Sequence, residues 1–89
     1  LTPVNEASMP FAECLWYSNK SCSIYEKNIE ETCLELNIPF LSIHEKMVKI
    51  LSFKELISSD GIHLNTEGHK WIFDQINEWQ VLKRWADLK

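Results

Sequence analysis

A helical stretch that leads directly into a short apolar run most limits what this chain can fold into. Ser23 and Glu26 have the spacing of a helix-capping box. Asn37 is suited to the helix C-terminus because asparagine tolerates the left-handed conformation, and Pro39 blocks continuation. We therefore predict a helix that begins at Ser23 and ends near Asn37. Its buried stripe would consist of residues at helical spacing: Tyr25, Ile29, Cys33 and Leu36. Its charged residues, Glu26 among them, lie mostly on the other faces and are expected in solvent.

The run Ile38–Ile43 follows at once and is nearly all apolar, which is typical of a buried parallel strand. Leu1–Val4 resembles the end of another strand. The succession strand, helix, strand predicts a right-handed β-α-β unit and hence an α/β fold with a parallel sheet.

The remaining segments are interpreted more coarsely. Residues 10–17 could form a short helix, and residues 45–51 a short helix or an ordered loop. The last helix is predicted to begin at Asn65 or Thr66, either of which can cap it, with a break near Gln80 left open. Its expected stripe contains Trp71, Ile72, Gln75, Ile76 and Trp79, with Leu82 and Trp85 or Ala86 as extensions.

Composition narrows the class of protein. The chain has 89 residues, 45% hydrophobic and 25% charged, which indicates a globular domain or part of one. A net charge of −4 without any basic run argues against nucleic acid as the partner. The sequence has no apolar run of about 18 residues, so we expect no membrane span, and no signal peptide is visible.

The cysteines indicate the cellular location, and the first residues indicate how much of the domain the chain contains. Cys14, Cys22 and Cys33 cannot all pair within one chain, and we expect them to be reduced, which favours a cytoplasmic location. The chain opens at Leu1 without an initiator methionine. We expect residues 1–89 to be the C-terminal part of a longer domain.

The chemistry concentrates in the stretch Asp60-Gly61-Ile62-His63. This spacing lets the Asp60 carboxylate reach one ring nitrogen of His63 and leaves the other nitrogen free for a nucleophile. Gly61 can take the backbone angles of a tight loop. The alternative is a purely structural role, in which Asp60 caps a turn and His63 is an ordinary surface residue.

The stretch from Asp60 to His69 reads DGIHLNTEGH and resembles the last motif block of GDSL-type, or SGNH, hydrolases. The resemblance covers nearly the whole chain. It implies the C-terminal portion of a flavodoxin-like, three-layer parallel-sheet fold, with Asp60 and His63 as two members of a catalytic triad. It also implies serine-dependent hydrolysis of carboxylic esters, as in esterases, lipases and acylhydrolases, with no cofactor. Leu64 departs from the family, because many members carry proline at that position.

A larger departure is the absence of the family's serine motif and of its oxyanion-hole glycine and asparagine. We expect a missing N-terminal segment or a companion chain to supply the serine, and the isolated chain to be inactive. The substrate would be a small-molecule ester whose binding residues are unknown. Seven of the serines lack the strand-to-helix setting of a nucleophile and are not assigned: Ser18, Ser21, Ser23, Ser42, Ser52, Ser58 and Ser59.

Other residues have weaker claims to function. Asp60, His63 and His69 are metal-ligand types, but their spacing matches no strong zinc signature, and we assign no metal. His44 or Glu45 could line a pocket after the predicted strand, although an inconsequential loop histidine fits as well. Trp71, Trp79 and Trp85 of the last helix are expected in the core or an interface rather than in a binding platform. Trp16 and Tyr17 are better pocket candidates. A non-catalytic α/β interaction module is the alternative to the enzyme.

Overall fold

Helices dominate the part of the chain that the structure describes. The computed structural model describes residues 1–8 and 18–87. Within these ranges the only β pairing is one isolated antiparallel bridge, between Ile57 and Leu64. The predicted α/β fold with a parallel sheet is therefore wrong for the described residues. The elements in chain order are η1 (Glu6–Ser8), α1 (Asn19–Glu35), α2 (Ile43–Val48), η2 (Phe53–Leu56), α3 (Thr66–Glu78) and α4 (Gln80–Asp87).

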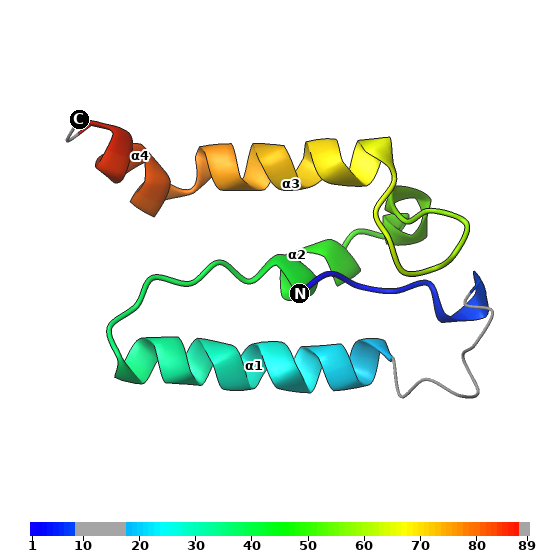
Figure 1. Cartoon of the computed structure of the whole chain (residues 1–89), viewed down its shortest axis with the longest axis horizontal. Helices are drawn as coiled ribbons and strands as arrows, with labels where there is room; N and C mark the ends of the chain where they lie inside the picture. Colours follow the sequence, from blue (N-terminus) through cyan, green and yellow to red (C-terminus); the bar gives the residue numbers. More distant parts are fainter. Residues whose placement is uncertain (9–17, 88–89) are drawn as a thin grey trace.

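Neither segment predicted as a strand forms one. The run after α1 is irregular up to Ser42, and its last residue, Ile43, begins α2 (Figure 1). At the other segment, the Val4 amide and carbonyl both bond the side chain of Asn19, at 2.8 Å each. A strand needs a neighbouring strand to satisfy its backbone groups, and the described residues supply none. The β-α-β unit is accordingly not formed.

Helix α1 begins earlier than the sequence pattern predicts. Ser18 is its N-cap, and the Ser18 hydroxyl accepts a hydrogen bond from the Ser21 amide at 3.0 Å. The predicted capping box of Ser23 and Glu26 is wrong because both residues lie inside the helix. Glu26, expected in solvent, is only 5% exposed.

The predicted C-terminus of this helix is confirmed. Asn37 has a φ of 60°, in the left-handed region. The Ile38 amide bonds the Cys33 carbonyl at 2.7 Å, and the Asn37 amide bonds the Leu34 carbonyl at 3.3 Å. These two bonds make a Schellman motif, which satisfies carbonyls at the end of the helix.

Helix α1 buries a different face from the predicted one. Tyr25 and Leu36 are 65% and 64% exposed, and Ile29 is also exposed. The buried residues of the helix are Cys22 and Glu26. The apolar stripe is therefore left on the surface, and the helix meets α2 through the face that carries Glu26.

The core is small and centres on α2. In the view of Figure 1, α2 and the N-terminal segment lie between α1 and α3. Met47 and His44 of α2 are fully buried side chains, as is Val4. Several large apolar side chains stay exposed around this core, including Phe73 and Ile76 of α3.

The last helix begins where the sequence predicts. Asn65 is the N-cap of α3, and its Oδ1 accepts a hydrogen bond from the Gly68 amide at 2.9 Å. The helical path breaks at Trp79, which has a ψ of 122°, so a separate α4 begins at Gln80. Within the predicted stripe Ile76 is exposed, while the other members are half-buried: Trp71, Ile72, Gln75 and Trp79.

Some expectations concern residues outside the described ones. The possible helix over residues 10–17, the pocket candidates Trp16 and Tyr17, and Cys14 all belong to that group. Cys22 and Cys33 are free thiols. Across residues 1–8 and 18–87, no helix combines the length and apolar character that crossing a bilayer requires.

Candidate catalytic dyad

The loop that carries Asp60 and His63 joins η2 to α3 and is closed at its base. Besides the bridge between Ile57 and Leu64, the Ser58 amide bonds the His63 carbonyl at 2.7 Å. The Asn65 amide bonds the Leu56 carbonyl at 3.0 Å. The two arms of the loop are therefore held together immediately before α3 begins.

Asn65 adds a side-chain clamp at the same place. Its Nδ2 donates to the Glu55 carbonyl at 2.6 Å, while its Oδ1 caps α3. One side chain thus joins η2 to the first turn of α3. The loop between these elements starts and ends at fixed points.

Asp60 and His63 contact each other directly. Nδ1 of His63 lies 2.5 Å from Oδ2 of Asp60. The other carboxylate oxygen, Oδ1, accepts the amides of Ile62 at 2.8 Å and His63 at 2.9 Å, and the Ser58 hydroxyl lies 3.0 Å away. The structure therefore brings together the two residues that the sequence singled out, with one carboxylate oxygen devoted to the loop and the other to the imidazole.

These contacts fix the charge of the carboxylate. The hydrogen bond to His63 holds the pKa of Asp60 well below its usual range, and the amides of Ile62 and His63 act in the same direction. The carboxylate is therefore ionised at neutral pH. When the His63 ring carries one proton, an ionised carboxylate on Nδ1 keeps the proton there and leaves Nε2 as the nitrogen that can accept another.

The far side of the imidazole faces solvent. The His63 side chain is 80% exposed. Gly61 has a φ of 77°, which explains why a residue without a Cβ occupies the turn. The Gly61 carbonyl accepts the Asn5 amide at 2.8 Å, so the N-terminal segment supports the loop from outside. The dyad is thus presented at the surface of the described residues.

Other sequence candidates lie apart from this pair or outside the described residues. His69 is exposed on the first turn of α3. Within residues 1–8 and 18–87, no group of three His, Cys, Asp or Glu side chains is placed to hold a metal ion. No serine of these ranges hydrogen-bonds Nε2 of His63. Ser58 contacts the dyad only through Asp60 and the His63 carbonyl.

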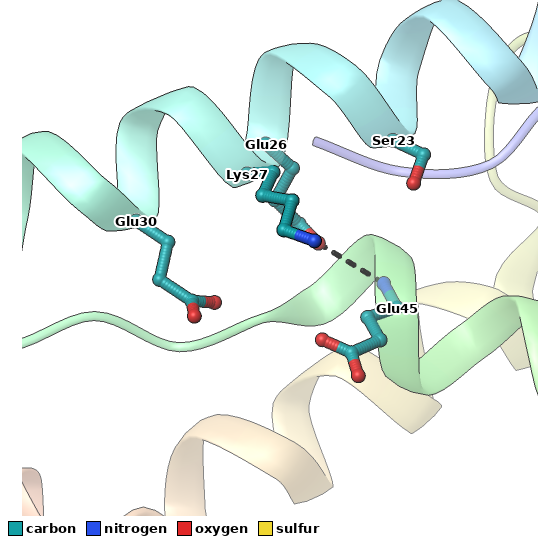
Figure 2. A pocket seen from close by; sticks show the side chains of 5 residues that line it. All are labelled: Ser23, Glu26, Lys27, Glu30 and Glu45. Atoms are coloured by element: carbon teal, nitrogen blue, oxygen red, sulfur yellow. Dashed lines mark hydrogen bonds between the residues drawn. The ribbon is translucent and has the colours of Figure 1, made fainter.

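His44 and Glu45 lie in another part of the molecule. His44 is buried, and its Nε2 has no hydrogen-bond partner among the described residues. Burial lowers the pKa of its imidazole. Glu45 borders a hollow between α1 and α2 that Ser23, Glu26, Lys27 and Glu30 complete (Figure 2), so neither Asp60 nor His63 lines it.

Glu26 is the residue in this region that sequence reasoning missed. Its two carboxylate oxygens accept the amides of His44 at 2.9 Å and Glu45 at 3.0 Å (Figure 2 shows the second bond). Glu26 therefore caps α2 from another helix. No local pattern announces this contact, because the partners are 18 and 19 positions away along the chain.

Comparison with known proteins gives a distant relative. The chain is similar to the GDSL esterase/lipase CPRD49 of Arabidopsis thaliana, with 26% identity over an alignment of 97 positions, gaps included. The alignment covers 97% of this chain and 38% of that protein, so the chain spans well under half the length of this relative. No family model and no solved structure matches the chain.

Proposed function

We propose that this chain supplies Asp60 and His63 to a serine-dependent hydrolase of carboxylic esters. The observation that carries the proposal is the direct bond between Asp60 and Nδ1 of His63, which leaves Nε2 open to solvent. The distant similarity to a GDSL esterase/lipase supports the same class of reaction.

The proposed chemistry follows from this geometry. Nε2 of His63 takes the proton of a serine hydroxyl while the serine oxygen bonds the ester carbonyl carbon. The same proton then passes to the departing alcohol as its C–O bond breaks, which leaves an acyl-serine. Water repeats the sequence, giving its proton to His63, and releases the acid. Asp60 orients the ring and stabilises the imidazolium in both halves of the reaction.

The serine would come from outside the described residues, either from a further segment of the polypeptide or from a companion chain. The chain spans only 38% of its relative, which leaves room for such a segment. The exposed apolar face of α1, with Tyr25 and Ile29 and with Leu36 at the C-cap, supports this view because a surface of this kind favours contact with other protein.

The first test locates the serine. The purified protein is treated with a fluorophosphonate probe, and intact mass and peptide mass spectrometry identify which polypeptide carries the label. Labelling of a serine in a companion or additional segment supports the proposal. Absence of any labelled serine, together with no hydrolysis of p-nitrophenyl acetate, contradicts it.

A matched pair of variants tests the dyad. His63→Ala should lower the hydrolysis of p-nitrophenyl acetate by at least about 10³-fold, since the general base is removed. His69→Ala removes another exposed histidine six positions away and should leave the rate within about twofold of the parent. Equal rates in the two variants would exclude His63 from the chemistry.

The exposed apolar side chains also favour a second candidate, a non-catalytic interaction module built from these helices. In that case the loop is only a structural connection, and association with a partner survives His63→Ala. The helical structure replaces the α/β module expected from the sequence. A partner that binds the chain but carries no reactive serine would favour this candidate.

A further inference from the structure

Ser58 contacts both members of the dyad although the proposed chemistry does not use it. Its Oγ lies 3.0 Å from Oδ1 of Asp60 and 2.8 Å from the His63 carbonyl. Its backbone amide also donates to that carbonyl at 2.7 Å. Ser58 therefore joins two parts of the loop through its contacts with the Asp60 carboxylate and the His63 carbonyl.

A serine hydroxyl has one proton to donate, so its two acceptors compete. The His63 carbonyl is the nearer acceptor and also receives the Ser58 amide. Oδ1 of Asp60 already accepts two amides, but it carries charge and is the stronger acceptor. The hydroxyl proton therefore goes chiefly to Asp60. With the amides of Ile62 and His63, it completes three donors on Oδ1.

This arrangement determines which way the carboxylate turns. Three donors on Oδ1 fix the rotation of the carboxylate about its last side-chain bond. Oδ2 then stays directed at Nδ1 of His63, at 2.5 Å. The Ser58 hydroxyl is the only one of the three donors that a side-chain substitution can remove without altering the backbone.

We propose that Ser58 is a positioning residue of the dyad, whose hydroxyl holds Asp60 in the rotation that keeps the His63 proton on Nδ1. The role in turnover rests on the proposed ester hydrolysis. The effect on the proton of His63 does not depend on it, because the contact exists without substrate.

The test that is independent of activity measures the His63 tautomer. In ¹⁵N-labelled protein at a pH where the ring is neutral, the ring-nitrogen chemical shifts report which nitrogen carries the proton. The parent protein should show Nδ1–H as the main form. Ser58→Ala should move a measurable fraction of His63 to Nε2–H. Ser59→Ala changes a neighbouring exposed serine whose side chain has no hydrogen bond to another described residue, and it should leave the parental ratio.

The kinetic test uses the protein that hydrolyses p-nitrophenyl acetate. Ser58→Ala should lower kcat about tenfold, which corresponds to 1.36 kcal/mol, while KM changes by less than about twofold. Ser58→Thr keeps a hydroxyl and should restore most of kcat and the parental tautomer ratio. A merely structural role would instead change both Ser58 variants alike.

The outcomes separate the two proposals. A tautomer change in Ser58→Ala but not in Ser59→Ala supports the positioning role, even if no ester is hydrolysed and the proposed function fails. An unchanged tautomer ratio in Ser58→Ala overturns the positioning role, even if hydrolysis is found. If circular dichroism shows that Ser58→Ala is unfolded, Ser58→Cys replaces it, because cysteine is similar in size and a weaker donor. The His63 tautomer ratio and kcat are then measured on Ser58→Cys.

Discussion

Replacing Gly68 by alanine tests whether close packing between α3 and η2 holds the dyad loop. Gly68 lies in the first turn of α3, and a Cβ added there would come within 2.2 Å of the Leu56 carbonyl oxygen. It would also lie 3.1 Å from Cβ of Leu64. A backbone oxygen cannot rotate away as a flexible side chain can. Either η2 or the first turn of α3 must move by roughly 1 Å to restore ordinary van der Waals contact.

The cost follows from what this shift disturbs. Overpacking of this kind costs about 1–3 kcal/mol. The bond from the Asn65 amide to the Leu56 carbonyl, 3.0 Å long, joins the two elements that must separate, and its loss costs about 1 kcal/mol. Alanine is favoured over glycine in a helix by about 1 kcal/mol, which opposes these terms. The packing cost is larger than the gain in helix propensity, and we expect the free energy of unfolding to fall by about 2 kcal/mol.

Thermal unfolding followed by circular dichroism measures this loss. For a domain of this size, about 2 kcal/mol corresponds to a fall in Tm of about 10 °C. Lys70→Ala places the same alanine at an exposed position of α3 and should shift Tm by no more than about 3 °C. A Gly68→Ala protein as stable as Lys70→Ala would refute the packing argument.

Three further predictions concern other positions. Glu26→Gln leaves one of the two α2 amides without its carboxylate acceptor and should cost about 2 kcal/mol in chemical denaturation, whereas Glu31→Gln, at an exposed position of α1, should cost under about 0.5 kcal/mol. Burial lowers the pKa of His44 below its ordinary 6.5, so the unfolded chain binds the proton first. The free energy of unfolding should therefore fall as pH drops below about 6.5, and His44→Gln should abolish that slope in pH-dependent denaturation. Gly61→Ala forces a side chain into a φ of 77° and should cost about 1–2 kcal/mol, measured by thermal unfolding; no change in Tm would contradict this reason.

Local chemistry was predictable from the sequence. A helix start was assigned to Asn65 or Thr66, and a helix end to Asn37. The structure has the cap at Asn65 and confirms the end at Asn37, because caps depend on residues a few positions apart. The approach of Asp60 to His63 follows equally from a spacing of three. Whether these two residues act in catalysis stays a prediction.

The predictions were wrong where contacts between residues far apart in the sequence determine burial or secondary structure. Glu26 was expected in solvent, yet it is buried because it caps α2, and no periodicity within α1 signals that partner. The stripe of Tyr25 and Ile29 was expected inside, but both side chains are exposed. The apolar run after α1 was taken for a strand, and it lacks the neighbour that would pair with its backbone. The pattern of apolar residues in one segment thus indicates which face the segment could bury. Which face it does bury depends on its contacts with the rest of the polypeptide.

The bonds that shape the dyad loop have a kinetic consequence. Those within residues 55–65 join positions no more than ten apart, as between Asn65 and Glu55. Among residues 1–8 and 18–87, only the bond from Asn5 to Gly61 joins this loop to a distant part of the chain. Low contact order makes a segment quick to organise, because little loop-closure entropy opposes it. During folding, Asp60 and His63 should therefore meet early, and the N-terminal segment should close over an already formed turn.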